Sequence, residues 1–251
     1  MSVDRIKKSF SLPDGDLPVL ESVSFDVEQG AFVSIVGPSG CGKTTLMKIL
    51  AGIMTLDDGR VLIRHSAEND IGRVAYMPQS DTLLPWRTAF SNALLPSQVE
   101  RIPRADAIAQ TRHLFDHFGL SGFENLYPIE MSGGMKQRLA LMRTFLCHRD
   151  IILLDEPLGA LDALTRSHLQ DWLASIWQEL RKTIILVTHD VEEALLLSDR
   201  IILLSSRPAH VRVQLKTDTP RPRTRTDAWL IEQKAKLLEL IHAEERDDEA
   251  A

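Results

Sequence analysis

The sequence predicts an α/β fold with a helical block inserted near its middle. Two observations lead to this prediction. Short, almost wholly apolar runs, typical of buried strands, alternate with amphipathic helical segments. From about residue 88 to residue 147 the strand signal nearly disappears and helical spacing takes its place. We therefore expect a sheet covered by helices, with a separate group of helices inserted between its strands.

The first third of the chain is dominated by strand and turn signals. A buried strand over 31–36 precedes a glycine-rich loop and then a helix from Lys43. This helix is expected to end at Gly52, because glycine readily adopts the left-handed conformation that follows a helix. The other predicted elements are strands within 3–36 with turns at Pro13–Gly15 and Gln29–Gly30, a turn at Asp57–Gly59, and strands near Arg60–Arg64 and Gly72–Tyr76.

Beyond position 130, helices and apolar strands alternate again. Ser132 is a favourable N-cap for a helix that carries Leu139, Met142 and Leu146. A helix over 163–180 would place six apolar residues on one face, namely Leu164, Leu169, Trp172, Leu173, Ile176 and Leu180. The remaining predicted elements are strands at Ile151–Leu154, Thr183–Val187, Ile201–Leu204 and Val211–Leu215, a Pro- and Arg-rich linker at Asp218–Thr226, a final helix over 227–243, and a frayed acidic tail at Glu244–Ala251.

Composition narrows the class of protein. The 251 residues suffice for one large domain with a subdomain, and 44% hydrophobic with 25% charged residues is ordinary for a soluble globular protein. The formal net charge of −6 gives no basic field that would favour nucleic acid. Two cysteines, Cys41 and Cys147, cannot build a disulfide framework and indicate a reducing compartment. We see no signal peptide and no apolar run of about 18 residues, so we expect no membrane span.

The segment Gly-Pro-Ser-Gly-Cys-Gly-Lys-Thr-Thr matches the phosphate-binding loop pattern G-x-x-x-x-G-K-[ST]. Its glycines let the backbone approach the phosphates, so that N–H groups form an anion nest at a helix N-terminus. In this pattern Lys43 lies on the β- and γ-phosphates and the hydroxyl of Thr44 lies on Mg²⁺. A chance glycine turn is the alternative, but the flanking strand and helix supply the required context. The predicted nucleotide-binding residues are Gly37, Pro38, Ser39, Gly40, Cys41, Gly42, Lys43, Thr44 and Thr45.

Polar residues also follow three other predicted strands, where ligand-binding residues of parallel sheets collect. Asp155 can hold Mg²⁺, and Glu156, which faces differently, can act as general base on the attacking water. His189 can reach a γ-phosphate or order the water, and Gln79 can contact Mg²⁺ or the water. Each has an ordinary alternative when taken alone: an exposed acidic pair, a structural histidine and a surface glutamine.

A second pair of glycines follows Ser132. Gly133 and Gly134 would expose backbone N–H groups at the start of a helix, which predicts a second anion site in the same chain. An ordinary capped helix is the alternative.

This set of motifs resembles the nucleotide-binding subunit of an ATP-binding cassette (ABC) transporter over nearly the whole chain. The implied fold is a P-loop NTPase cassette with a RecA-like core, an N-terminal antiparallel β subdomain and an inserted α-helical subdomain. The implied boundaries are an ATPase domain over 1–217, with its core at 1–87 and 148–217 and its helical subdomain at about 88–147, followed by a linker, C-terminal helix and acidic tail over 218–251. The corresponding motifs are Walker A at Gly37–Thr45, the Q-loop at Gln79, the signature at Ser132–Gly134, Walker B at Ile151–Asp155 with Glu156, the D-loop at Ala160–Asp162 and the switch histidine at His189.

The resemblance also implies that two cassettes pack head to tail, with each ATP between the Walker A of one subunit and the signature of the other. Asp162 would lie near the dimer contact. Phe10 matches the position that stacks on adenine, with a core phenylalanine as the alternative. The residues that would act on the nucleotide of their own subunit are Lys43, Thr44, Gln79, Asp155, Glu156 and His189. Among them the resemblance implies catalytic roles for Glu156, His189 and Gln79, and metal contacts for Thr44, Gln79 and Asp155. The residues that would act on the partner's nucleotide are Ser132, Gly133 and Gly134.

Two departures from the family pattern need mention. Met131 and Met135 replace the usual Leu and Gln of the signature, and Gly159 replaces a common serine before the D-loop. Met131 is a conservative apolar exchange for Leu. The Gly-Gly-Met pattern that ends at Met135 is common in one import subgroup. Neither departure removes a catalytic group, so we expect an active ATPase.

The implied function is ATP-driven solute import through a separate transmembrane permease, at the cytoplasmic face of the inner membrane. The segments Asp162–Arg166, Val191–Ala194 and Ser206–Pro208 resemble the nitrate/sulfonate/taurine class of bacterial importers, whereas Tyr76–Trp86 also resembles members that handle pyrimidines or vitamin precursors. A periplasmic or lipid-anchored solute-binding protein would be an indirect partner. An exporter-type ATPase and a soluble, non-transport ABC ATPase remain as alternatives.

The permease would contact the segment Gln79–Trp86 and the helical subdomain. Residues 83–86 of this segment are apolar and loop-like, so an exposed patch there would mark the partner site. The alternative is that these residues are buried against the helical block.

Overall fold

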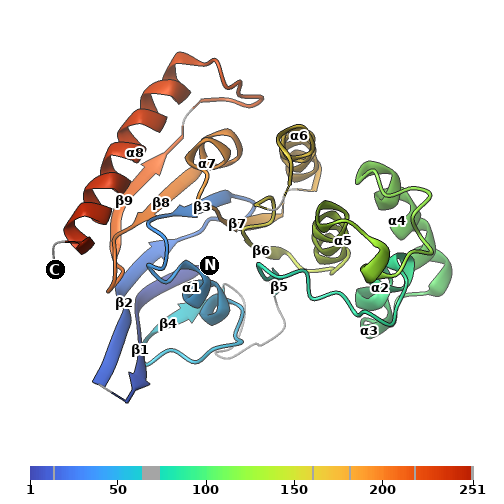
Figure 1. The fold of residues 1–251 in the computed structure, drawn as a ribbon, viewed down its shortest axis with the longest axis horizontal. Helices are drawn as coiled ribbons and strands as arrows, with labels where there is room; N and C mark the ends of the chain where they lie inside the picture. Colours follow the sequence, from blue (N-terminus) through green and yellow to red (C-terminus); the bar gives the residue numbers. More distant parts are fainter. Residues whose placement is uncertain (14, 64–73, 160, 181, 218, 250–251) are drawn as a thin grey trace.

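The computed structural model describes residues 1–13, 15–63, 74–159, 161–180, 182–217 and 219–249, which form two sheets and a group of helices set apart at one end (Figure 1). The main sheet has six strands. Five of them run parallel to one another, and the sixth, β9, runs antiparallel to its neighbour β8. In spatial order these strands are β5 (Val74–Met77), β6 (Ile151–Asp155), β7 (Thr183–Val187), β3 (Phe32–Val36), β8 (Arg200–Leu204) and β9 (Val211–Lys216).

A second, three-stranded sheet is antiparallel throughout. Its order is β2 (Gly15–Asp26), β1 (Ser2–Leu12) and β4 (Asp58–Leu62). It packs, together with helix α1 (Lys43–Leu50), on one face of the main sheet. This arrangement confirms the predicted antiparallel β subdomain.

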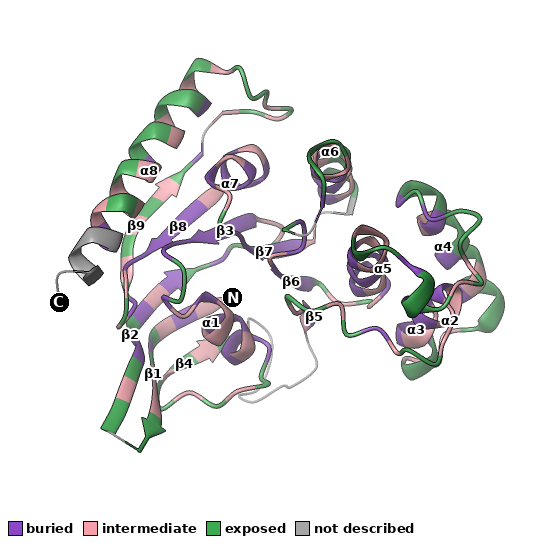
Figure 2. Cartoon of the chain, in the orientation of Figure 1, coloured by how far each residue is buried: buried purple, intermediate pink, exposed green. Residues whose placement is uncertain are grey.

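The inner strands β6, β7, β3 and β8 of the main sheet are buried on both faces, as their apolar sequences predict (Figure 2). Val33 and Ile35 belong to the cluster that contains α1 and the antiparallel sheet. Phe32 and Leu186 face the other way, toward α5 (Gly133–Phe145) and α6 (Ala163–Leu180). A third cluster joins β3 and β8 to α7 (Val191–Leu197) and α8 (Ala228–Glu249), which lies along the outer edge of the molecule (Figure 1).

The inserted helical block consists of α2 (Ala89–Ala93), α3 (Leu95–Val99), α4 (Arg104–His117), a 3₁₀ turn at Pro128–Glu130, and α5. Figure 1 shows these helices on the side of the main sheet opposite to α8. Ser132 caps α5 as predicted, because its hydroxyl accepts a hydrogen bond from Met135 N at 3.3 Å. No helix within the described ranges combines the length and the apolarity needed to cross a membrane.

Two expectations about local structure are wrong. Asp57–Gly59 is not a separate turn, because β4 already begins at Asp58 and pairs with β1. Asp57 itself contacts strand β1. Its carboxylate accepts hydrogen bonds from Lys8 Nζ at 2.6 Å and from Ser9 N at 2.7 Å. Leu164 does not belong to the buried face of α6, since it is 77% exposed beside the D-loop. Trp177, which the helical pattern did not include, is buried in its place.

The C-terminal expectation is also wrong, because α8 does not end at residue 243 but continues to Glu249. Glu244 is buried and fixes this end of the helix. Its carboxylate accepts from Ser206 N at 3.2 Å and pairs with Arg212 at 3.1 Å. Other expectations, at Asp14, Arg64, Gly72, Ala160, Asp218 and residues 250–251, lie outside the described residues.

Candidate functional site

The main sheet brings the predicted polar residues together at one edge. Strands β5, β6, β7 and β3 are direct neighbours and parallel, so their carboxyl ends meet at this edge. Gln79 follows β5, Asp155 ends β6, His189 follows β7 and Gly37 follows β3. Four segments that are far apart in the sequence therefore form one candidate site.

The loop Gly37–Thr45 is shaped for an anion. Gly40 and Gly42 have φ angles of 74° and 112°, a conformation that favours glycine and that turns backbone N–H groups toward one point. The buried ammonium of Lys43 lies inside the loop, where it donates to Gly37 O at 2.8 Å and to Pro38 O at 2.7 Å. Helix α1 begins at Lys43 itself, with Gly42 as its N-cap, so the last three residues of the loop form the first turn of the helix.

The other loop residues differ in exposure. Ser39 and Gly40 are exposed at the loop tip, whereas Pro38 and Cys41 are buried and Thr44 and Thr45 are half-buried. Burial raises the pKa of the Cys41 thiol, so this group stays a thiol beside Lys43. The loop thus presents backbone, hydroxyl and ammonium groups, with no negative charge of its own.

The oxygen atoms of Thr44 and Asp155 suit a magnesium ion. Thr44 Oγ1 donates to Asp155 Oδ1 at 3.3 Å, and Tyr76 OH donates to the other carboxylate oxygen at the same distance. Burial raises the pKa of Asp155, since a charged carboxylate in this fully buried position lacks solvation. A divalent cation would offset that cost, and one carboxylate, one hydroxyl and phosphate oxygens form a donor set that Mg²⁺ accepts.

Glu156 lies at the centre of a second group of contacts. Its Oε2 atom accepts from Gln79 Nε2 at 3.0 Å and lies 3.6 Å from His189 Nδ1. The residue has a φ of 50°, an uncommon value for a residue other than glycine. The structure therefore places Gln79 against Glu156 and not against the Thr44–Asp155 pair.

The segment Ser132–Gly134 begins α5 on the inserted block. A Cβ atom added to Gly133 would meet nothing within 4 Å, and one added to Gly134 would approach Leu161 at 3.3 Å. No hydrogen bond among the described residues joins this segment to the loop Gly37–Thr45. Asp162 is exposed and starts α6, because its carboxylate accepts from Thr165 N at 3.0 Å; this bond lowers the pKa of Asp162.

Phe10 lies near the end of β1, opposite Leu17 of β2. Its ring is half-buried against the cluster that includes α1, and the Lys8 ammonium is 5.7 Å from the ring centroid. Part of the ring is therefore packed and part is accessible.

A family model described as an ABC transporter matches residues 20–159, which is more than half of the chain. The chain belongs to the ABC transporter family. The match contains the loop Gly37–Thr45, the segment Ser132–Gly134 and the Asp155–Glu156 pair.

Relatives of this ABC protein cover nearly its full length. The aliphatic sulfonates import ATP-binding protein SsuB of Bacillus cereus is 38% identical over 95% of this chain and 94% of its own. The formylaminopyrimidine import ATP-binding protein ThiZ of Halalkalibacterium halodurans is 40% identical over 84% and 83%. The taurine import ATP-binding protein TauB of Roseobacter denitrificans is 39% identical over 86% and 81%.

Solved ABC cassettes share the fold. A bacterial ABC transporter cassette solved as a dimer superposes with a TM-score of 0.79 at 28% identity, over 87% of this chain and 99% of its own. The same cassette in a post-hydrolysis state, bound to ADP and Pi, gives the same TM-score at 27% identity. These likenesses confirm the ABC cassette fold predicted from the motifs, and ATP binding follows from the family.

Three contacts of the ABC site were not predicted. Tyr76 binds Asp155, Gln137 Nε2 donates to Glu156 O at 3.2 Å, and Val19 of β2 packs against Gly42. The sequence holds no motif that indicates them, because each contact joins segments that meet only in the folded chain. Tyr76 of β5 holds the Asp155 carboxylate, and Gln137 of α5 holds the backbone carbonyl of Glu156.

The close approach of β2 makes Gly42 sensitive to substitution. In Gly42→Ala the added Cβ would lie 2.8 Å from Val19 Cγ1 at a φ that alanine disfavours, so we expect a loss of about 1–3 kcal/mol in the free energy of unfolding. The measurement is urea unfolding. Gly40→Ala is the matched control, because its φ is also positive while its Cβ would meet nothing within 4 Å. Equal unfolding midpoints for the two variants would contradict the steric argument.

Proposed function

We propose that this chain is the ATP-hydrolysing subunit of a solute importer, acting on Mg-ATP as one of two paired cassettes and powering a separate membrane permease. The observation that carries the proposal is the meeting of Gln79, Glu156 and His189 beside the phosphate loop. We assign the ATPase domain to residues 1–217, with the core at 1–87 and 148–217 and the helical subdomain at about 88–147, followed by a C-terminal segment at 218–251.

In the proposed reaction the loop amides and Lys43 hold the β- and γ-phosphates. Mg²⁺ held near Thr44 and Asp155 would neutralise part of the negative charge on the phosphates. Glu156 takes a proton from the attacking water, and its contacts with Gln79 and His189 orient its carboxylate toward that water. His189 then also lies within reach of the γ-phosphate. Phe10 stacks on the adenine through the accessible part of its ring.

A second cassette completes each site in this proposal. Ser132 and Gly133 are exposed at the N-terminus of α5, Gly134 is half-buried, and there is open space around Gly133, so the segment can meet the phosphates bound by a partner chain. Asp162, exposed beside it at the start of α6, would lie at the contact between the two chains. The dimeric state of the solved ABC cassette supports this pairing.

The solute class is proposed from the relatives. Proteins named for import of aliphatic sulfonates, taurine and formylaminopyrimidine resemble this chain to a similar degree. We therefore propose import of a small organic solute of the sulfonate, taurine or pyrimidine-precursor kind, delivered to the permease by an extracytoplasmic binding protein. The cassette itself would lie at the cytoplasmic face of the membrane.

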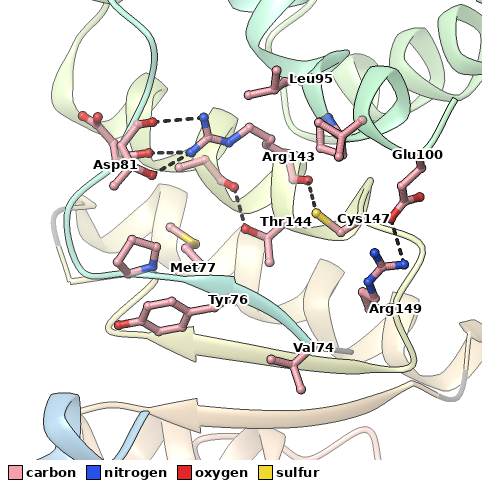
Figure 3. Close-up of a pocket in the computed structure, with 15 residues that line it drawn as sticks. Val74, Tyr76, Met77, Asp81, Leu95, Glu100, Arg143, Thr144, Cys147 and Arg149 are labelled. Carbon is pink, nitrogen blue, oxygen red and sulfur yellow. Dashed lines mark hydrogen bonds and ion pairs between the residues drawn. The ribbon is translucent and has the colours of Figure 1, made fainter. Parts of the chain in front are cut away.

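A pocket between β5 and the helical block is the proposed permease contact (Figure 3). It has a volume of about 330 Å³ and lies directly after the strand that leads to Gln79. Figure 3 shows Arg143 of α5 crossing to the Asp81 segment, where it donates to Asp81 O and Thr82 O at 3.1 Å each. Leu83 is buried against the helical block, whereas Trp86 is 71% exposed and Val99 is 73% exposed. Val99 lines this pocket, and Trp86 lies in the segment Gln79–Trp86 that follows β5. Exposed apolar groups of this kind suit a docking helix.

The proposal is tested by co-purification with the cognate permease and by hydrolysis. The purified chain should release phosphate from ATP with Mg²⁺ and not with EDTA. Trp86→Asp should weaken recovery with the detergent-solubilised permease by about tenfold or more, since it places a charge at an apolar contact. Ile231→Asp, at a 57% exposed position on α8, is the control. Equal recovery of both variants contradicts the assigned contact, and absence of Mg-dependent hydrolysis contradicts the enzyme.

A further inference from the structure

Three arginines of the segment before α8, which we call the arginine clasp (Arg221, Arg223 and Arg225), all bind around α7. Helix α7 has seven residues and begins two positions after His189. A helix this short has little stability of its own in water. Its position, and that of the preceding turn, therefore depends on what holds it.

Two members of the clasp hold the far end of α7. Arg221 donates to Leu197 O at 2.5 Å and to Asp199 at 2.7 Å. Arg223 donates to Leu195 O and to Ser198 O, both at 2.7 Å. These cations satisfy carbonyl groups at the C-terminus of the helix, where positive charge is favourable.

Arg225 joins two helices with one guanidinium group. Its Nε donates to Glu192 of α7 at 2.9 Å. Its Nη2 donates to Gln170 at 2.6 Å and its Nη1 to Ser167 at 3.3 Å, both on α6. Helix α6 starts directly after Asp162 and α7 starts directly after His189 and Asp190. Arg225 thus links the two helices that follow the D-loop and the switch histidine.

A buried polar path continues from Arg225 to the turn that carries His189. Gln170 and Glu193 are only 4% and 3% exposed, and the Glu193 carboxyl lies beside Gln170 and Thr188, with its Oε1 atom left without a hydrogen-bond partner among the described residues. Thr188 Oγ1 in turn accepts from Asp190 N at 3.0 Å, across His189. Burial raises the pKa of Glu193 to about 7, so this carboxyl keeps its contacts with little charge under mildly acidic conditions.

A second cation ties the same turn to the D-loop. Arg166 of α6 donates to Leu161 O at 2.9 Å and lies 3.9 Å from the Asp190 carboxylate. Asp190 caps α7, accepting from Glu192 N at 2.9 Å and from Glu193 N at 3.2 Å. The turn that holds His189 is therefore fixed from α6 both directly, by Arg166, and through Gln170, which Arg225 holds.

We propose that Arg225 is a positioning residue for ATP hydrolysis, which holds α7 against α6 and thereby keeps His189 in reach of the nucleotide. This inference rests on the proposed role of His189. It assigns the segment 219–227 a role in positioning the catalytic groups of its own chain, although the segment contains none of the residues assigned to nucleotide binding. Displacement of a reacting group by about 1 Å can cost on the order of a hundredfold in rate, so a remote anchor can matter.

The test is steady-state hydrolysis by Arg225→Ala. We expect kcat to fall about ten- to hundredfold while the KM for ATP stays within about twofold, because the phosphate loop is untouched. Arg225→Lys should give an intermediate kcat, since an ammonium can keep the pair with Glu192 but cannot bridge both helices. Arg212→Ala is the matched control, because it removes a different arginine–carboxylate pair. That pair joins Arg212 of β9 to Glu244 of α8 and lies away from α6.

Coupling to His189 separates positioning from general destabilisation. In a His189→Ala background the Arg225→Ala change should have no further effect on kcat. Wild-type kcat in Arg225→Ala, an equal loss in Arg212→Ala, or an additive loss in the double variant would each overturn the inference. Wild-type kcat in His189→Ala alone would instead overturn the proposed role of the histidine.

Discussion

Glu156→Gln is expected to lower phosphate release about 10²- to 10⁴-fold while ATP binding persists. The amide has the shape of the carboxylate but cannot accept a proton from water. Glu156 Oε2 lies 3.0 Å from Gln79 Nε2 and 3.6 Å from His189 Nδ1, so this carboxylate is the one that both side chains orient. Phosphate release measures the loss, and titration with a fluorescent ATP analogue measures binding.

The same variant should accumulate as an ATP-bound dimer on size exclusion, since hydrolysis would no longer reopen the pair. Glu130→Gln is a suitable control, because the Glu130 carboxylate accepts from Tyr127 N in its own turn. Turnover close to wild type in Glu156→Gln would show that another group activates the water.

Gly133→Asp should abolish hydrolysis without unfolding the chain. A Cβ at this position meets nothing within 4 Å, so the side chain fits, but its carboxylate would face the phosphates bound by the partner subunit. Like charges at a contact cost several kcal/mol, which corresponds to roughly 10²-fold or more in assembly and turnover. Phosphate release and ATP-dependent dimerisation both report this loss, while ATP binding by the separate chain should be unchanged.

Mixing tests whether the two anion sites lie on different subunits. A mixture of Gly133→Asp with Lys43→Ala places one intact site in each mixed dimer, so turnover should recover to at most about a quarter of wild type. Gly133→Asp with normal turnover on its own would show that Ser132–Gly134 takes no part in the site.

The sequence predicted those parts of the site that depend on local pattern. The strand, glycine loop and helix around Lys43 follow each other in the chain, so their structure could be inferred directly. The polar residues after each strand were also recognisable, because parallel strands collect such residues at one edge. Their adjacency depends on the order β5-β6-β7-β3, which no local signal specifies.

The errors and omissions share a physical cause. Gly59 has the look of a turn residue, but a Cβ there would lie 2.4 Å from Arg5 O, so it is the close packing of β1 on β4 that requires glycine. Leu164 fits the helical pattern yet is exposed beside the D-loop, and Glu244 fits a solvated tail yet is buried. At Gly59 and Glu244 a segment that is distant in the sequence decides the outcome. The same holds for Tyr76, Gln137 and the arginine clasp, whose partners lie far away in the sequence.

Helix α5 connects three parts of the molecule along one rigid axis. It begins at Ser132, which would face the partner's nucleotide, donates from Gln137 to the backbone of Glu156, and binds the rim of the pocket through Arg143. Its 13 residues span about 20 Å, and a helix of this length shifts as one body. In the proposed function, movement of the pocket rim would therefore be transmitted through α5 both to Glu156 and to the opposite subunit, so that α5 would couple the permease contact to the nucleotide.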